Sequence, residues 1–307
     1  MSRERPSLRL RLADLVMRAR LAVTPALTEA TIVPLNRQLL ERSPFLRYRI
    51  PAGLTRRADR VGGVEGEWIA RAGARRDRVL LFLHGGGYFG GSPRSHRGIT
   101  TTLAQQLDAS VFVPGYRLAP EHPFPAALDD AAAVFRAIAT ADTRVVVAGD
   151  SAGGGLALAL ASMMRAHAGT PRALYLLSPW TDLALTGESL RINERRDALF
   201  RYDFFPLAAG LYLRGADARD PRASPVFAPM AGLPPTLIQV GSGEMLFDDS
   251  ARVAAQLREV GVSAQLDVWT DAPHVFQMVP HLLPESRDAL AIGARFLQQA
   301  LDDPTRS

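Results

Sequence analysis

The chain is 307 residues long and 47% hydrophobic, which is enough to bury a substantial core in one large domain. It contains no cysteine, so disulfides, zinc–thiolate sites and cysteine nucleophiles are excluded. The net charge is +5, and all 36 basic residues are arginine, which we interpret as a bias of genomic composition. No apolar run reaches the roughly 18 to 20 residues that a membrane-spanning helix needs.

The first 60 residues are strongly basic, with 13 arginines against five acidic residues. Apolar spacing predicts helices over residues 7–20 and 26–42, and because they precede any strand we expect a separate helical piece. The first helix leaves two alternatives open: contact with anionic lipid or nucleic acid, or a solvated cover that its leucines pack over the domain. Charged residues interrupt 8–23, which makes a poor signal-peptide core. We expect a cytoplasmic protein with no stable membrane insertion and no nucleic-acid partner.

From residue 64 the sequence alternates between apolar strands and helices. The strand over 78–83 has no polar face, which is typical of parallel strands covered on both sides. This order predicts an α/β fold with a mostly parallel central sheet flanked by helices. About seven strands are predicted, over residues 64–70, 78–83, 110–114, 145–148, 173–177, 236–240 and 264–269. Helices are predicted over 125–139, 156–165, 246–260 and 285–301.

The chain is organised around a serine that follows the strand over 145–148. Gly149, Ser151 and Gly153 form the pattern Gly-x-Ser-x-Gly. Such a turn strains the serine backbone, needs small neighbours and lifts the hydroxyl to the C-terminal edge of the sheet. The N-terminus of the next helix then lies beneath the hydroxyl and stabilises an anion there. Alone, the pattern also fits an ordinary glycine-rich turn, so a base, an acid and an oxyanion loop must accompany it.

A second glycine-rich loop, His84-Gly85-Gly86-Gly87, directly follows a buried strand. Consecutive glycines raise the entropic cost of ordering a chain, so they need a reason. One interpretation is a flexible turn. The other is a loop whose N–H groups face a substrate oxygen, and the strand position and the histidine favour it. We expect His84 to brace this loop.

Residues 183–232 break the alternation of strands and helices. An excursion of this length inside a compact domain is usually functional, and this one holds several prolines and an aromatic group. We expect it to form a lid that closes over Ser151 together with the N-terminal helices. An aromatic lid favours an apolar pocket for small or medium acyl groups. Its aromatic residues are Phe200, Tyr202, Phe204, Phe205 and Tyr212.

The base for Ser151 must lie on a loop at the same edge of the sheet. Of the six histidines, His274 lies just past the last predicted strand, in Asp271-Ala272-Pro273-His274, and meets this condition. His167 and His281 are expected at ordinary surface positions.

The acid is expected after the strand over 236–240, which gives the chain order serine, acid, histidine. Glu244 lies at the strand exit, where a loop can aim it at the histidine, and its side chain is long enough to reach an imidazole. Asp248 and Asp249 fall in the first turn of the next helix, where acidic residues commonly interact with the helix dipole. We therefore prefer Glu244, and Asp248 remains the alternative.

These motifs, in this order, resemble the hormone-sensitive-lipase family of carboxylesterases, which has the α/β-hydrolase fold. The resemblance runs from about residue 80 to residue 276. The family's usual acid is an aspartate, and Glu244 stands at that position here. The motifs that carry the resemblance are His84-Gly85-Gly86-Gly87, Tyr116-Arg117-Leu118-Ala119-Pro120-Glu121-His122-Pro123, Gly149-Asp150-Ser151-Ala152-Gly153 and Asp271-Ala272-Pro273-His274.

The resemblance implies a serine carboxylesterase that hydrolyses short- to medium-chain esters and needs no metal or organic cofactor. It also implies the site residues: Ser151 as nucleophile, His274 as base, Glu244 as acid, and the N–H groups of Gly86, Gly87 and Ala152 as the oxyanion hole.

The resemblance also divides the chain. A helical cap is expected over residues 1–45 and 183–215, and an α/β-hydrolase core over 46–182 and 216–307. A homodimer is suggested, paired through the strand over 264–269 if its edge is free. Other functions stay open: an amidase, a lactonase or a carbamate hydrolase uses the same triad. The plant gibberellin receptors bind a ligand on this fold, but they lack the catalytic histidine that this chain has as His274.

Overall fold

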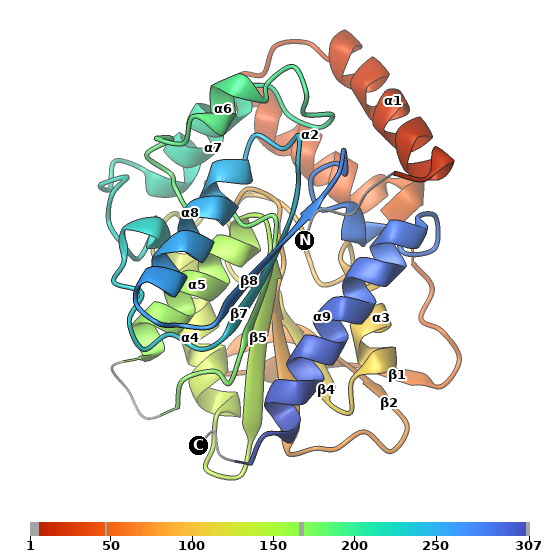
Figure 1. Ribbon diagram of the computed structural model, residues 1–307, viewed down its shortest axis with the longest axis vertical. Coiled ribbons are helices and arrows are strands. Elements are labelled where there is room, and N and C mark those ends of the chain that lie inside the picture. The colour runs from red at the N-terminus through yellow and green to blue at the C-terminus, as the bar shows by residue number, and fades with distance from the viewer. Residues whose placement is uncertain (1–5, 47, 166–168, 305–307) are drawn as a thin grey trace.

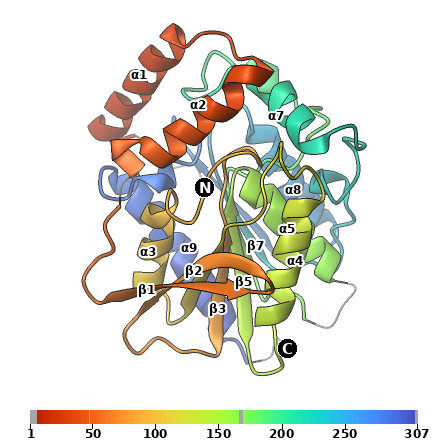
Figure 2. The ribbon, with the colours of Figure 1, turned by 180° about the vertical axis from the view of Figure 1, so that it is seen from behind.

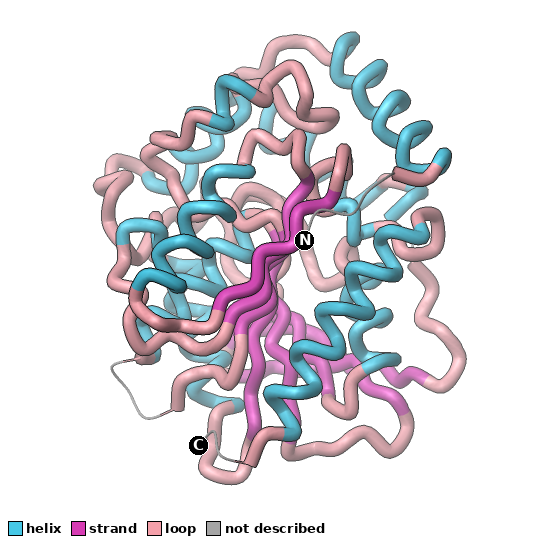
Figure 3. Tube along the Cα trace, in the orientation of Figure 1, coloured by secondary structure: helices cyan, strands magenta, loops and turns pink. Residues whose placement is uncertain are grey.

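An eight-stranded sheet runs through the middle of the molecule in the order β1-β2-β4-β3-β5-β6-β7-β8 (Figures 1 and 3). The computed structural model of the chain describes residues 6–46, 48–165 and 169–304. β1 and β2 pair antiparallel at one edge, and the neighbours from β4 to β8 pair in parallel. The strands are β1 Leu54–Val61, β2 Val64–Arg71, β3 Arg78–Leu83, β4 Ser110–Pro114, β5 Arg144–Asp150, β6 Leu174–Leu177, β7 Thr236–Gly241 and β8 Ala264–Trp269.

The predicted α/β class and the mostly parallel sheet are confirmed, and the seven predicted strands correspond to β2–β8. The strand β1 is not predicted from the sequence, because its residues are mostly polar and exposed and show no apolar alternation. A cue was present in Gly62 and Gly63, which join β1 to β2 with positive φ angles of 57° and 84°. Two such residues between strands are typical of a tight hairpin turn.

Helices cover both faces of the sheet, which explains why its central strands β3, β5, β6 and β7 have no polar face. In β3, Leu80 and Phe82 belong to the core beneath one face, and Leu81 and Leu83 to the core beneath the other. One face is covered by α3 Arg97–Gln106 and α9 Pro284–Asp302. The opposite face is covered by α4 Ala126–Ile138, α5 Ala152–Met164 and α8 Phe247–Glu259 (Figures 1 and 2).

Four further helices lie together at the carboxyl end of the parallel strands, at the top of Figures 1 and 2. We call them the cap helices. Arg37 of α2 holds this group to the rest of the molecule, because its Nε donates to the carbonyl of Phe89 (2.8 Å) and its guanidinium pairs with Glu121 (2.6 Å). α2 also contacts α7. The cap helices are α1 Leu8–Val23, α2 Glu29–Arg42, α6 Ser189–Ile192 and α7 Phe204–Leu213.

α1 forms where the sequence predicts a helix, but its leucines do not pack as one of the two alternatives supposes. Only Leu10 is buried, whereas Leu8, Leu12 and Leu15 are exposed. That alternative is therefore wrong for these three leucines. Within the described part of the chain, no helix combines the length and apolar character needed to cross a membrane.

Candidate active site

Ser151 lies in the sharp turn that joins β5 to α5. Its backbone has a φ angle of +53°, a conformation that strains any residue with a side chain. The turn depends on its glycines: a Cβ on Gly153 would overlap the carbonyl of Leu83, and one on Gly149 would overlap the carbonyl of Gly153. The N–H of Ser151 donates to the carbonyl of Leu177 on β6 (2.8 Å), which fixes the turn at the edge of the sheet.

Ser151, His274 and Glu244 form one continuous chain of hydrogen bonds. His274 Nε2 lies 2.9 Å from Ser151 Oγ, and His274 Nδ1 lies 2.7 Å from Glu244 Oε2. The His274 imidazole and the Glu244 carboxylate are almost completely buried. The three residues lie far apart in the sequence. Loops that follow β5, β7 and β8 bring them to the same end of the sheet.

Of the two acids that the sequence leaves open, only Glu244 reaches His274. Its second oxygen, Oε1, accepts hydrogen bonds from Ser178 Oγ (2.7 Å) and from the N–H of Gly241 (2.5 Å), so the carboxylate cannot rotate freely. Asp248 instead accepts a hydrogen bond from the N–H of Ser189, at the start of α6 (2.9 Å). Asp248 therefore holds a cap helix to α8.

Burial and the glutamate act in opposite directions on His274. Burial lowers the pKa of the imidazole, but the hydrogen bond that the ring donates to Glu244 and the negative charge of Glu244 raise it, and the net pKa is above the ordinary value of 6.5. The glutamate thus stabilises the imidazolium. In a serine–histidine–acid triad, the histidine becomes positively charged when it accepts the serine proton.

The glycine loop after β3 presents free backbone donors near Ser151. Gly86 and Gly87 have φ angles of +120° and +67°, which favour glycine. Among the residues that the structure describes, the N–H groups of Gly86, Gly87 and Ala152 have no hydrogen-bond acceptor. Ala152 is the first residue of α5, where the first N–H groups of a helix have no partner within it.

A buried pair behind the serine holds this loop, and the sequence analysis missed it. Asp150 Oδ1 accepts from the N–H of Gly85 (3.0 Å), and its Oδ2 lies 3.2 Å from His96 Nε2. Burial lowers the pKa of His96, but the charge of Asp150 and its hydrogen bond more than offset this, so the pKa is raised. Asp150 and His96 are 54 positions apart, so no local spacing connects them.

His84 lies beside the glycine loop as the sequence suggests. Its Nδ1 is 2.9 Å from the carbonyl oxygen of Gly85, and its ring stacks on Tyr116 with the centroids 4.2 Å apart. Burial, followed by the neighbouring His96, lowers the pKa of His84 to about 3, so this ring stays neutral. A neutral, stacked ring next to the loop is suited to bracing it.

The aromatic segment of the cap packs against His274. The ring of Phe200 packs edge-on against His274 at 4.9 Å. Asp197 fastens this segment to the loop that carries the glutamate: its Oδ2 accepts from the N–H of Met245 (2.9 Å), and its Oδ1 from the N–H of Phe200 (3.0 Å). Burial raises the pKa of Asp197.

A cavity of about 280 Å³ lies on the Glu244 side of His274. Residues of α1 form part of its wall, and many of the lining groups are charged. Arg18 connects α1 to the cap segment in this wall, because it pairs with Asp14 (2.7 Å) and donates to the carbonyl of Arg195 (2.9 Å). Ser151 does not line this cavity.

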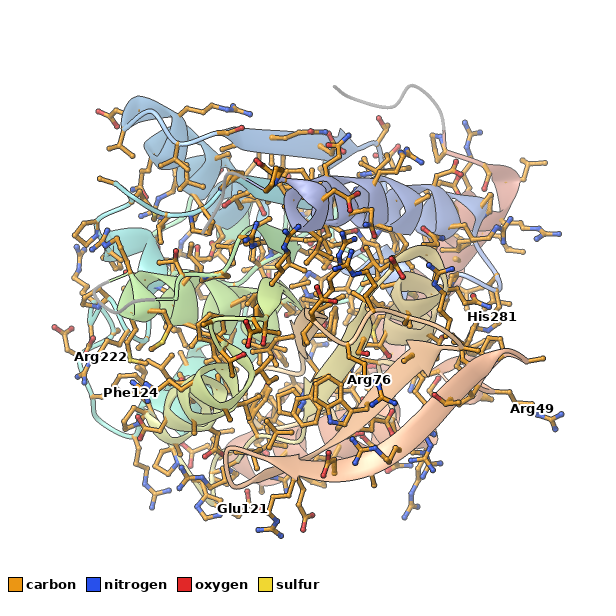
Figure 4. All side chains as sticks on the ribbon, turned by 90° about the horizontal axis from the view of Figure 1, so that it is seen from below. Arg49, Arg76, Glu121, Phe124, Arg222 and His281 are labelled. Carbon is orange, nitrogen blue, oxygen red and sulfur yellow. The ribbon has the colours of Figure 1, made fainter. Side chains whose placement is uncertain are left out.

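The other histidines lie away from this centre. His122 is exposed, and His281 lies at the periphery of the molecule, where its ring meets Tyr48 at 5.5 Å (Figure 4). His167 falls outside the described residues. In the ranges that are described, no three His, Cys, Asp or Glu side chains form a group that could hold a metal ion.

Comparison with known proteins identifies the family. Residues 80–278, well over half of the chain, match a family model described as the alpha/beta hydrolase fold. An acetyl-hydrolase from Streptomyces hygroscopicus is 41% identical over 246 residues, which cover 78% of this chain and 81% of that protein. An esterase from Acinetobacter venetianus is 39% identical over 242 residues, 77% and 80% of the two chains.

Solved structures agree with the sequence comparison. The crystal structure of an esterase from the bacterial hormone-sensitive lipase family superposes with a TM-score of 0.87 and 38% identity, over 97% of this chain and 100% of that one. The fold and the match therefore define an α/β hydrolase. The chain belongs to the hormone-sensitive-lipase family of carboxylesterases and is a serine carboxylesterase.

Proposed function

We propose that Ser151, His274 and Glu244 are the catalytic triad of this esterase. Neutral His274 takes the proton of the Ser151 hydroxyl at Nε2 while the serine oxygen attacks the ester carbonyl. The C–O bond to the alcohol then breaks, and the imidazolium returns its proton to the departing alcohol oxygen. Water, deprotonated by His274, releases the acid from the acyl-serine. The hydrogen-bond chain from Ser151 to Glu244 is the observation that carries this proposal.

In the same mechanism the N–H groups of Gly86, Gly87 and Ala152 bind the oxyanion of each tetrahedral intermediate. Their lack of other acceptors among the described residues supports this role. Loss of one such donor costs about 3–4 kcal/mol of transition-state stabilisation in other enzymes. Because the donors are backbone groups held by Asp150 and α5, they need no rearrangement when the charge develops.

We further propose that the substrates are esters with short to medium acyl chains. The packing of Phe200 against His274 supports this, since it leaves an aromatic surface beside the reacting atoms. The Streptomyces relative is named an acetyl-hydrolase, which supports a small acyl group.

We propose the division of the chain into a cap, 1–45 and 183–215, and a core, 46–182 and 216–307. The grouping of the cap helices at one end of the sheet supports it (Figure 1). A homodimer through β8 is also proposed, because β8 is the edge strand of the sheet. Sedimentation velocity tests the dimer. A cytoplasmic location, supported by the charges that interrupt residues 8–23, is tested by cell fractionation.

Hydrolysis of p-nitrophenyl esters from acetate to palmitate, with Ser151→Ala as the control, tests the proposed function. We expect kcat/KM to be highest for the short esters and to fall by at least about 10⁴ in the variant. Equal activity of the variant would remove Ser151 as the nucleophile. Activity confined to amides, lactones or carbamates would replace the proposed substrate class and leave the triad in place.

A further inference from the structure

The outward face of α1 is apolar, although solvent exposure favours polar residues there. Leu8, Leu12 and Leu15 are exposed by 82%, 62% and 63%, and Val23 by 81%. Spacings of four, three and eight residues put these side chains on one side of a helix, and Ala19 fills the gap between the last two. We call this set, with the neighbouring Val16, the α1 stripe.

The opposite face of α1 is fastened to the molecule, so the stripe is held facing outward. Leu10 packs in a cluster with Trp269 and Phe276. The N–H of Ser7, just before the helix, donates to Glu285 on α9 (2.7 Å), and Arg18 donates to the carbonyl of Arg195 in the cap (2.9 Å). These contacts come from several parts of the chain, and together they fix the rotation of α1 about its axis.

Arginines flank the stripe on both sides. At 100° per residue, Arg9 and Arg20 lie along one side of the stripe and Arg11 along the other. In the part of the chain that is described, none of these three forms an ion pair, whereas Arg18 on the inner side pairs with Asp14. The outer face of α1 therefore combines apolar side chains with uncompensated positive charge.

Three other large apolar side chains outside α1 are also exposed near or within the cap. Phe45 follows α2, and Ile192 and Leu199 belong to the cap segment that carries α6 and Phe200. A row of exposed apolar side chains along one helix face, as in the α1 stripe, is typical of a surface that binds a partner. Because arginines lie on both sides of the α1 stripe, a suitable partner must present negative charges next to an apolar region.

We propose that α1 lies on the surface of an anionic phospholipid bilayer, with the stripe inserted among the acyl chains and the arginines against the lipid phosphates. A second copy of this chain suits the face poorly, because a two-fold contact would bring like-charged arginine rims together. The 16 residues of α1 are about 24 Å long, too short to cross a hydrocarbon core of about 30 Å. The helix therefore lies in the interface.

This orientation would bring the ester site close to lipid. Asp14 and Arg18 of α1 line the cavity beside Glu244 and His274. If α1 binds the bilayer through its outer face, this cavity lies about one helix diameter from the membrane surface. Esters that dissolve in the membrane would then be available to the cap side of the enzyme.

Flotation with vesicles tests the proposal on the full chain. Vesicles of phosphatidylcholine with 25% phosphatidylglycerol are compared with pure phosphatidylcholine, at 50 and 500 mM NaCl. The apolar variant is Leu8→Gln, Leu12→Gln and Leu15→Gln, and its control is Val260→Gln, an exposed apolar residue on another helix end. The charge variant is Arg9→Ser, Arg11→Ser and Arg20→Ser. Its control, Arg57→Ser, Arg76→Ser and Arg136→Ser, removes the same charge from exposed sites elsewhere.

We expect the protein to bind the anionic vesicles at 50 mM NaCl and to dissociate at 500 mM. The charge variant should bind about 100-fold more weakly, from roughly fivefold per arginine, and the apolar variant at least tenfold more weakly. Both controls should bind like the wild type. All variants change exposed side chains and should keep their melting temperature.

Three results would overturn the proposal. The first is a wild type that floats with neither vesicle, and the second is binding of each variant as strongly as its control. A stable dimer in light scattering that the Leu→Gln changes dissociate would assign the α1 stripe to a second copy instead.

Discussion

The region around Ser151 and the helix α1 differ in how the fold constrains them. The residues on either side of Ser151 in the chain are buried, and the backbone of Ser151 is strained. Gly149 and Gly153 let backbone carbonyl groups lie where the Cβ of any other residue would be. On α1 only Leu10 is buried, and the apolar side chains of the outer face are exposed to solvent.

Residue composition therefore has a different physical cause in the two regions. Around Ser151 the residue types are dictated by packing and hydrogen bonding, so they report on the fold and the chemistry together. The outer residues of α1 contribute little to folding, because exposed side chains away from special contacts change stability by about 0.5 kcal/mol or less. Leucines that are retained on such a face need another explanation, such as a surface that covers them.

The largest effect is expected for glycine replacement in the region around Ser151, compared with an exposed glycine in a cap helix. In Gly153→Ala the new Cβ overlaps the backbone carbonyls of Leu83 and His84, so we expect a loss of more than about 4 kcal/mol in the free energy of unfolding, or failure to fold. The matched change Gly210→Ala lies in the cap helix α7, where a Cβ meets nothing within 4 Å. It should stabilise the protein by about 0.5–1 kcal/mol. Urea unfolding of both variants measures this; equal effects would contradict the comparison.

A smaller loss of stability is expected when the buried support of the glycine loop after β3 is removed. His96→Asn takes away the partner of Asp150 Oδ2 and leaves a buried carboxylate with less compensation, at a cost of about 3 kcal/mol in unfolding free energy. Since Asp150 also holds Gly85, kcat for p-nitrophenyl acetate should fall more than KM rises. His122→Asn, at an exposed histidine, is the control and should change neither quantity. If the His96→Asn variant is less stable but has an unchanged kcat, His96 contributes to folding stability and not to catalysis.

The smallest effects are expected on α1, where inner and outer leucines can be compared directly. Leu10→Ala removes a buried side chain and should cost about 2–3 kcal/mol in unfolding free energy. Leu12→Ala removes an exposed one and should stay within about 0.5 kcal/mol. Thermal unfolding in the absence of lipid measures both, and an equal loss from the two would mean that the stripe is packed in solution.

Much of the fold could be predicted because strands buried on both faces have a distinctive composition. The α/β class, the strands β2–β8 and the family were predicted correctly. The exposed strand β1 lacks such a pattern, and α3 was not predicted at all. For α1 the periodicity indicates that the helix has two faces, but tertiary contacts such as those of Leu10 decide which face is buried.

The site residues remain predictions about catalysis, but their arrangement could be anticipated from chain order and strand ends. Glu244 and Asp248 are four residues apart, and the turn after β7 decides which of them faces His274. Residues that position the site residues were not predicted. His96 pairs with Asp150 across 54 positions of the sequence, and Ser178 donates a hydrogen bond to Glu244 across 66 positions. Contacts between residues so far apart cannot be predicted from a local sequence pattern.

The assignment of Glu244 is tested most directly by the pH dependence of kcat/KM for p-nitrophenyl acetate in wild type, Glu244→Gln and Asp248→Asn. His274 must be neutral to act as a base, so activity is lost as the pH falls through its pKa, which Glu244 raises above 6.5. We predict that Glu244→Gln lowers kcat/KM by about 10³–10⁴ and moves the acid limb to lower pH, because the group that raises the pKa is gone. Asp248→Asn should keep the wild-type profile. A wild-type profile in Glu244→Gln, with activity lost in Asp248→Asn, would contradict the assignment.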